Sequence, residues 1–209
     1  MRTMAPGGRP EPDAAVAPAR WFIALWPDAA TCAALQSLQS CWSWPPRARP
    51  TCAGRLHLTL HFLGPLPESA IDPLHHVLAG VAASPWHWTL RRASVWPGGI
   101  AVVEPVQVPA AARALHVALG EVLRAQGLPQ EARPWRPHVT LARRAHGAAT
   151  PHSFEPVEWT ARSFELVCSD RGYRRVARWA LAARAGGDAP SARRSEERRV
   201  GKECFVPCR

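Results

Sequence analysis

Two short stretches of the chain pair a histidine with a threonine, and these residue types suit chemistry on a phosphate group. They are His57-Leu58-Thr59-Leu60 and His138-Val139-Thr140-Leu141. Two histidines can divide acid and base work, because a pKa of about 6.5 lets one be neutral while the other is protonated. Threonine hydroxyls and a nearby arginine can donate hydrogen bonds to phosphate oxygens. Such a site requires no metal ion.

The surroundings of both stretches predict β-strands that point the histidine and the threonine the same way. Residues 56–63 alternate with a period of two, which places His57, Thr59 and His61 on one face and Leu58, Leu60 and Phe62 on the other. Residues 138–142 form a second, shorter strand of the same kind. Side chains two residues apart on a strand are about 7 Å apart, a suitable span for two contacts to one phosphate. We therefore expect a duplicated unit that brings two imidazoles and two hydroxyls to one cleft.

The rest of the pattern predicts a mixture of strands and helices. Further strands are expected at residues 21–26, 88–96, 100–103, 164–168 and 176–181, and helices at 29–42, 67–81 and 109–126. Trp21, Trp26, Trp88 and Trp96 are interpreted as core residues. Arg47, Arg49 and Arg55 precede the first motif and are interpreted as a solvated loop, with an RNA groove as the alternative.

The 209 residues are expected to form one domain over residues 20–184. Residues 1–19 are rich in Pro, Ala and Gly and predict a disordered leader, and residues 185–209 predict a disordered tail. Residues 194–209 contain the only lysine, Lys202, and resemble the translated read-through of a sequencing adapter. We interpret that stretch as a sequence artefact without a function.

The composition indicates where the protein is located and what kind of partner it binds. The sequence has no apolar run of transmembrane length and no secretory signal, so we expect a cytoplasmic protein without a membrane partner. Its six cysteines lack zinc-site spacing, and no metal or cofactor is expected. The formal net charge of +10 fits an anionic partner such as a nucleic acid, and equally a genome that favours arginine codons.

Two longer motifs resemble those of a known family. His57-x-Thr59-Leu60-x-Phe62-Leu63-Gly64 and Pro137-His138-Val139-Thr140-Leu141-Ala142-Arg143 are similar to the signatures of the 2H phosphoesterase superfamily. The bacterial RNA 2′,3′-cyclic phosphodiesterases, also called 2′-5′ RNA ligases, are the most similar branch. Residues 20–26 and 169–181 resemble that branch too, so the resemblance covers roughly residues 20–182.

The resemblance implies roles for six residues. His57 and His138 become the catalytic pair, Thr59 and Thr140 the phosphate binders, and Arg143 a basic residue close to the substrate. Trp135, just before the second motif, becomes a candidate for stacking on a base. The family's reaction opens a 2′,3′-cyclic phosphate to leave a 2′-phosphate. We assign His138 to activating water and His57 to protonating the leaving O3′, an order that the sequence does not fix.

The expected fold is α+β, with two pseudo-symmetric lobes whose largely antiparallel sheets carry helices on their outer faces. The cleft lies between the lobes. The expected substrates are RNA with 2′,3′-cyclic phosphate ends or small cyclic-phosphate nucleotides, handled by a monomer. Two alternatives stay open, namely 2′-5′ RNA ligation by the same residues and a non-catalytic module that binds single-stranded RNA. ATP-dependent ligation through a lysyl adduct is disfavoured, because residues 1–193 contain no lysine. His61 is expected at the rim of the cleft.

Overall fold

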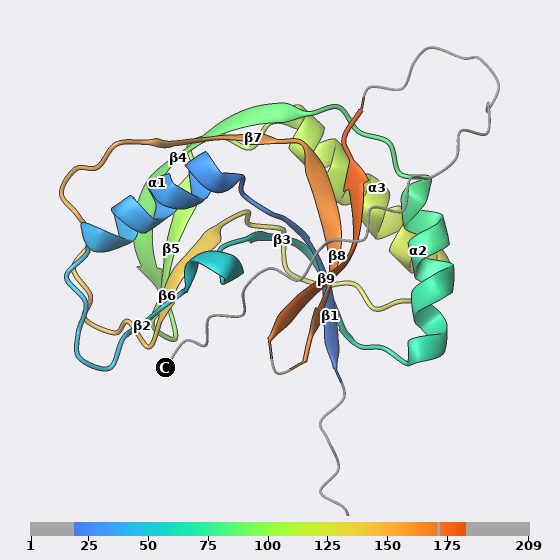
Figure 1. The fold of residues 1–209 in the computed structure, drawn as a ribbon, viewed down its shortest axis with the longest axis horizontal. Coiled ribbons are helices and arrows are strands. Elements are labelled where there is room, and N and C mark those ends of the chain that lie inside the picture. The colour runs from blue at the N-terminus through green and yellow to red at the C-terminus, as the bar shows by residue number, and fades with distance from the viewer. Residues whose placement is uncertain (1–18, 171, 183–209) are drawn as a thin grey trace, which may run out of the picture.

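The structure, a computed structural model, describes residues 19–170 and 172–182 (Figure 1). The tail predicted for residues 185–209 lies outside the described residues, and so does all of the predicted leader except Ala19. Ala19 packs against the hydrophobic core.

Each predicted strand and helix is present in the structure. The strands are β1 (Arg20–Leu25), β2 (Arg49–Pro50), β3 (Leu58–Pro65), β4 (Trp86–Trp96), β5 (Ile100–Pro105), β6 (Val139–Arg143), β7 (Val157–Ala161), β8 (Ser163–Ser169) and β9 (Tyr173–Ala180). The helices are α1 (Ala29–Ser40), α2 (Ile71–Ala79) and α3 (Ala110–Ala125), with short 3₁₀ turns at Ala53–Arg55 and Glu68–Ala70. The sequence did not predict β2 or β7. The buried Val157, Trp159 and Ala161 alternate along β7, a signal that could have revealed it.

The sheet consists of two antiparallel halves, which confirms the α+β class. The strand order is β7-β4-β5-β6-β3-β1-β8-β9, and β2 pairs with β6. The halves meet at β3 and β6, where the register contains a single residue pair, Leu58 opposite Val139. In Figure 1 the two halves diverge on either side of this junction.

Helices cover one face of each half of the sheet. α1 lies over the half that contains β4 to β7, whereas α2 and α3 flank the half that contains β1, β3, β8 and β9 (Figure 1). Asp28 begins α1, since its Oδ1 accepts a hydrogen bond of 2.8 Å from the backbone N–H of Thr31. One continuous core joins the helices to the sheet through buried side chains that include Leu35, Leu78 and Leu115. The predicted placement of the helices on the outer faces is confirmed.

The opposite face of the sheet carries a smaller apolar cluster. It consists of Phe22, Ala24 and Val167, with the half-buried Trp26 packed against it.

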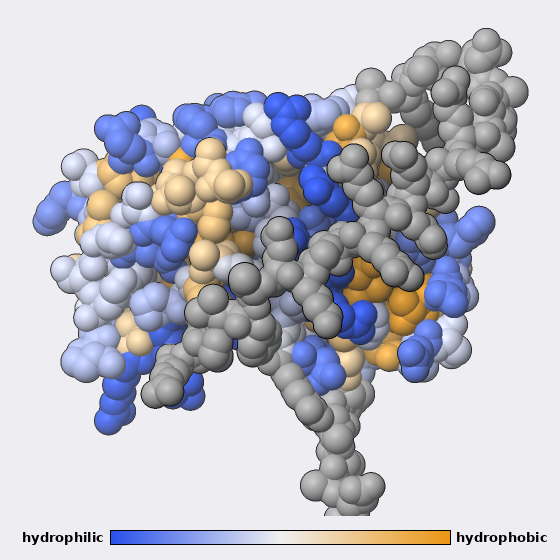
Figure 2. All heavy atoms as spheres, viewed as in Figure 1, coloured by the Kyte–Doolittle hydropathy of each residue, from blue (hydrophilic) through white to orange (hydrophobic). Residues whose placement is uncertain are grey.

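Figure 2 shows that the surface of the molecule in this view is mostly hydrophilic, with a compact hydrophobic area beside α2. Within the described residues, no helix has the length and apolar character needed to span a membrane.

A β-bulge in β3 overturns the predicted position of His61. Ala24 pairs with Thr59 and the next residue, Ile23, pairs with His61, so β3 has one extra residue, Leu60, between the two pairs. Because directly paired residues project from the same face, the bulge turns His61 to the core face with Ile23. There His61 Nε2 donates to the carbonyl oxygen of His116 on α3 at 2.8 Å. The prediction that His61 lines the rim of the cleft is wrong.

The same bulge moves Phe62 in the opposite direction. Phe62 pairs with Phe22, so it faces away from the core, and it is 42% exposed. The prediction that Phe62 shares a face with Leu58 and Leu60 is wrong, because Leu58 and Leu60 are both buried in the core.

The junction between the halves should depend on the packing of Leu58, which is 0% exposed. We expect Leu58→Ala to lower the free energy of unfolding by roughly 2–5 kcal/mol, because it removes buried methyl groups and leaves a cavity. Urea denaturation measures this change. Val117→Ala, at a site 55% exposed, is the matched control and should change it by less than about 0.5 kcal/mol. Equal effects of the two substitutions would contradict the central role of Leu58.

Candidate active site

The single residue pair between β3 and β6 brings the two His-x-Thr motifs together. Leu58 and Val139 face each other and both lie in the core. In an antiparallel pair, this register puts His57 opposite Thr140 and Thr59 opposite His138, on the face away from the core. Regular geometry sets directly opposed Cβ atoms about 5 Å apart and the two histidines, on the diagonal, roughly 7–8 Å apart. The four side chains that the sequence singled out thus border one site.

Each histidine is held by the same hydrogen bond. His57 Nδ1 lies 2.6 Å from the carbonyl oxygen of Arg55, and His138 Nδ1 lies 2.8 Å from that of Arg136. A carbonyl oxygen only accepts, so Nδ1 carries the hydrogen in both rings. Neither Nε2 has a hydrogen-bond partner among the described residues, which leaves this nitrogen of each ring to take up or give a proton.

Aromatic side chains surround both imidazoles. The His57 ring stacks on Trp26 at 5.1 Å with an interplanar angle of 13°, and Phe22 and Tyr173 lie 5.1 and 5.3 Å away. The His138 ring lies 4.3 Å from the ring of Trp96. Trp26 and Trp96 are therefore half-buried walls of the site, and their predicted place in the core is wrong, whereas Trp21 and Trp88 are core residues as predicted.

Behind each tryptophan lies an arginine paired with a buried glutamate. Arg136 lies 4.3 Å above Trp96 and donates two hydrogen bonds, of 2.7 and 2.9 Å, to Glu104, which is 6% exposed. In the other half, Arg175 lies 5.6 Å above Trp26. Its Nε is 3.5 Å from Glu165, which is 2% exposed. In both halves of the sheet, a glutamate thus pairs with an arginine, the arginine packs over a tryptophan, and the tryptophan ring contacts the histidine.

These two glutamates were not among the residues predicted from the sequence. Each interrupts a strand of apolar residues, Glu104 in β5 and Glu165 in β8. A carboxylate inside such a run is a detectable signal, because carboxylates are rarely buried without a partner.

Burial lowers the pKa of both histidines. The pKa of His57 falls to about 4, because burial and the charges of His138 and Arg143 outweigh the hydrogen bond that the ring donates to the Arg55 carbonyl oxygen. Burial, Arg136 and Arg143 also lower the pKa of His138, while the Arg136 carbonyl and Glu104 act in the opposite direction. In the free protein both rings are therefore mainly neutral at pH 7. The charge of Arg143 acts on both, which places this exposed residue beside the pair.

Trp135 lies beside the edge of β3. Its Nε1 donates to the carbonyl oxygen of Thr59 at 3.1 Å. One side of its ring stacks on His116 at 4.5 Å, and His116 stacks on His61 at 4.2 Å. Base stacking by Trp135 stays a prediction, and only the other side of the ring is available for it.

The described residues contain no group of three or more His, Cys, Asp and Glu side chains arranged to hold a metal ion. His57 and His61, which a helical H-x-x-x-H motif would bring together, project from opposite faces of β3 because of the bulge. They cannot share one ion.

Comparison with known proteins agrees with this geometry. The 2′-5′ RNA ligase superfamily matches residues 27–172. The chain belongs to this superfamily. It is 34% identical over 150 residues to the RNA 2′,3′-cyclic phosphodiesterase of Escherichia coli K12, an alignment that covers 66% of this chain and 83% of that protein. It is 33% identical over 134 residues to the protein of the same name from Thermus thermophilus, which covers 58% of this chain and 67% of the relative.

Solved structures of superfamily members have the same fold. The crystal structure of Escherichia coli LigT complexed with 3′-AMP superposes with a TM-score of 0.68 at 26% identity, covering 80% of this chain and all of LigT. The crystal structure of TT0787 from Thermus thermophilus superposes with a TM-score of 0.58 at 29% identity, covering 78% of this chain and 97% of TT0787.

The environment of the two histidines leads to a titration prediction. NMR of the imidazole nitrogens should show His57 gaining a proton only near pH 4, and His138 gaining one below its ordinary pKa. Glu104→Gln should lower the pKa of His138 further, because it removes the negative charge that favours the protonated ring. Glu158→Gln, on the exposed side of β7, is the matched control and should leave His138 unchanged. Titration of His57 at its ordinary pKa would contradict the closed aromatic environment.

Proposed function

We propose that the protein is an RNA 2′,3′-cyclic phosphodiesterase that hydrolyses a 2′,3′-cyclic phosphate to a 2′-phosphate. The observation that carries the proposal is the opposed pairing of His57-x-Thr59 and His138-x-Thr140 across the β3–β6 junction. The similarity to relatives that bear this name supports it. We expect the protein to act as a monomer in the cytoplasm, as predicted from the sequence.

The proposed reaction is a single displacement at phosphorus. One neutral histidine accepts a proton at Nε2 from the attacking water, and the new P–O bond forms as the P–O3′ bond breaks. The other histidine, protonated at Nε2, gives its proton to O3′, which leaves a 3′-hydroxyl and a 2′-phosphate. Thr59 and Thr140 donate to the non-bridging oxygens, and Arg143 offsets their charge. The residues named supply every proton, so the proposal needs no metal ion.

The order of the two histidines can be argued from their surroundings. From the family resemblance we assigned His138 to the base and His57 to the acid, an order that the sequence does not fix. The charges in the free protein favour the reverse, because Glu104 raises the pKa of His138 while that of His57 falls to about 4. A negatively charged phosphate at the site raises the pKa of both rings and lets one of them hold the proton.

Each catalytic histidine should be essential. We expect His57→Ala and His138→Ala each to lower kcat on a 2′,3′-cyclic phosphate by about 10²- to 10⁴-fold, the usual contribution of a general acid or base. Binding of RNA should be largely kept. His152→Ala changes an exposed histidine outside the site and serves as the control. If both variants kept the wild-type rate, the catalytic pair would be wrong. Binding without turnover by the wild type would favour the RNA-binding module.

A substrate with an activated leaving group distinguishes the histidine that acts as the acid from the one that acts as the base. A p-nitrophenyl phosphodiester has a leaving group that needs no proton, so the variant that lacks the acid should retain turnover and the variant that lacks the base should not. The charges of the free site lead us to expect retention in His138→Ala. Retention in His57→Ala instead would support the assignment made from the sequence.

Product analysis tests reaction type and metal dependence together. A defined oligonucleotide with a 2′,3′-cyclic phosphate end should yield a 2′-phosphate in the presence of EDTA. Loss of turnover on chelation would overturn the metal-free mechanism. The ligation alternative uses the same residues with a 5′-hydroxyl in place of water, and it would appear as a 2′-5′ linkage when an RNA with a free 5′-hydroxyl is added.

A further inference from the structure

Two arginines face each other beside the reaction centre without any acidic partner. Arg49 in β2 is directly opposite Arg143 in β6, so both side chains project from the same face. Like charges in directly opposed positions destabilise a strand pair. Both side chains are exposed, and neither guanidinium has a hydrogen bond or an ion pair among the described residues. A bound anion would relieve this repulsion.

The fold holds Arg49 in place by a buried hydrogen-bond network. Gln39, a buried polar residue of α1, donates from Nε2 to the carbonyl oxygens of Thr51 at 2.9 Å and Leu141 at 2.7 Å. The backbone N–H of Thr51 also donates to Leu141 at 2.7 Å. The two-residue strand β2 is therefore fixed to β6, and the opposition of the two arginines follows from this fixed register.

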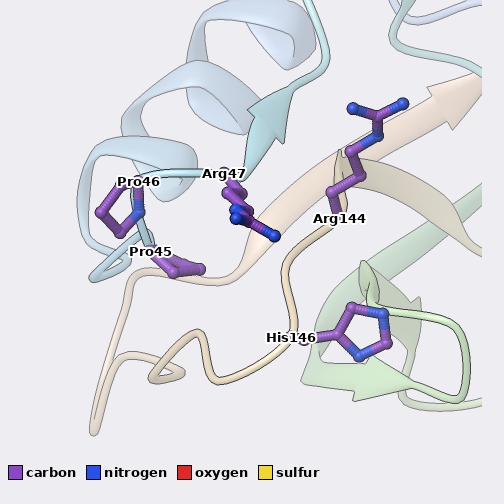
Figure 3. Close-up of a pocket in the computed structure, with 5 residues that line it drawn as sticks. All are labelled: Pro45, Pro46, Arg47, Arg144 and His146. Atoms are coloured by element: carbon purple, nitrogen blue, oxygen red, sulfur yellow. The ribbon is translucent and has the colours of Figure 1, made fainter.

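The segments that flank this pair of arginines line a hollow. It has a volume of about 620 Å³ and is lined by Pro45, Pro46, Arg47, Arg144 and His146, with no acidic residue (Figure 3). Figure 3 shows Arg47 on the segment that leads into β2 and Arg144 just after β6. Arg144 has a φ of 54°, a left-handed conformation that is unfavourable for an arginine. The backbone turns at this residue, so Arg144 does not continue the line of β6.

We propose that Arg49 forms a second phosphate site together with the neighbouring Arg143, which also offsets the charge of the cyclic phosphate. This second site binds the phosphate on O5′ of the nucleotide that carries the cyclic phosphate. Arg47 and Arg144 extend this site toward the upstream nucleotides. The proposal rests on the proposed function. It identifies the substrate class as the ends of RNA chains, because a nucleoside 2′,3′-cyclic phosphate lacks the O5′ phosphate.

The chemistry of an RNA end leads to this assignment. The cyclic phosphate occupies the two histidines and two threonines, and the nearest other phosphate in the chain is on O5′ of the same ribose. Arg143 is in β6, three residues after Thr140, and its charge contributes to the lowered pKa of both histidines. Arg49, its direct neighbour, is one step farther from the reaction centre. Guanidinium groups bind phosphate oxygens through two parallel hydrogen bonds, which a paired set of arginines is well placed to make.

Three substrates test the second phosphate site. They are a nucleoside 2′,3′-cyclic phosphate, the same compound with a 5′-phosphate, and a dinucleotide with a 2′,3′-cyclic phosphate end. We expect the wild-type kcat/KM to rise by about tenfold or more from the first substrate to the second, the size of a charge-assisted contact. The dinucleotide carries a phosphodiester on O5′, whereas the second substrate carries a terminal phosphate there. A higher kcat/KM on both substrates would show that the site binds the phosphate group that they share.

Substitutions of Arg49 test whether this residue causes the rise in kcat/KM. Arg49→Gln should reduce the gain from the 5′-phosphate to about twofold or less, and Arg49→Lys should keep part of it because the positive charge remains. Arg113→Gln removes an exposed charge on α3 and should keep the wild-type ratio. Thermal unfolding of each variant excludes loss of fold as the cause of a lower ratio.

The outcomes separate the two proposals. If the wild type turns over all three substrates with the same kcat/KM, or if Arg49→Gln keeps the full gain, the second phosphate site is overturned and the proposed function stands. If the wild type opens none of the three, both proposals fail.

Discussion

The contact between Leu58 and Val139 is the constraint on which the site depends. It is the single residue pair between β3 and β6, and it joins the two halves of the sheet. An antiparallel pair has a local two-fold axis, so the residues on either side of this contact form a symmetric set. The side chains of Leu58 and Val139 enter the core, and the four flanking side chains must then point to the opposite face. Packing energy on one side of the sheet thus fixes how the two histidines and the two threonines are arranged on the other side.

The surroundings of the two histidines explain how imidazoles of the same kind can take different roles. The repeated order of glutamate, arginine, tryptophan and histidine gives each ring an apolar wall and a charged pair behind it. The two copies differ in their pairing. Arg136 and Glu104 form two short hydrogen bonds, which hold the pKa of Glu104 below its ordinary value despite burial. In the other half, burial raises the pKa of Glu165, and Arg175 and Arg178 offset this only in part. Glu104, behind His138, is therefore the more readily ionised of the two carboxyl groups.

The arginines around the site have two kinds of environment, and this separates structural from ligand-binding charges. Arg136 and Arg175 each pair with a buried carboxylate and cover a tryptophan. Arg49 and Arg143 face each other across the β2–β6 pair and have no ion pair among the described residues. The proposed second phosphate site gives these two guanidinium groups a partner in the substrate. The net charge alone did not show which basic residues could bind an anion, whereas their surroundings in the structure distinguish Arg49 and Arg143 from the paired arginines.

The sequence by itself determined most of the strands and helices and the candidate residues of the site. Period-two alternation and turn residues are local signals, so β3, β6 and the α+β class could be predicted, and the repeated His-x-Thr spacing singled out His57, Thr59, His138 and Thr140. Signals that depend on pairing between distant strands could not be read in the same way. The bulge at Leu60 sends His61 to the core face and Phe62 to the surface, although alternation predicts the reverse.

Only the tertiary structure decided which tryptophans line the site and which arginines lack a partner. An apolar run such as residues 21–26 looks the same whether one or both of its faces are buried, so Trp26 could not be separated from Trp21. The opposition of Arg49 and Arg143 depends on the buried Gln39, which binds two segments about a hundred residues apart. The chain's local pattern thus set which groups can react, and long-range packing set where each of them points.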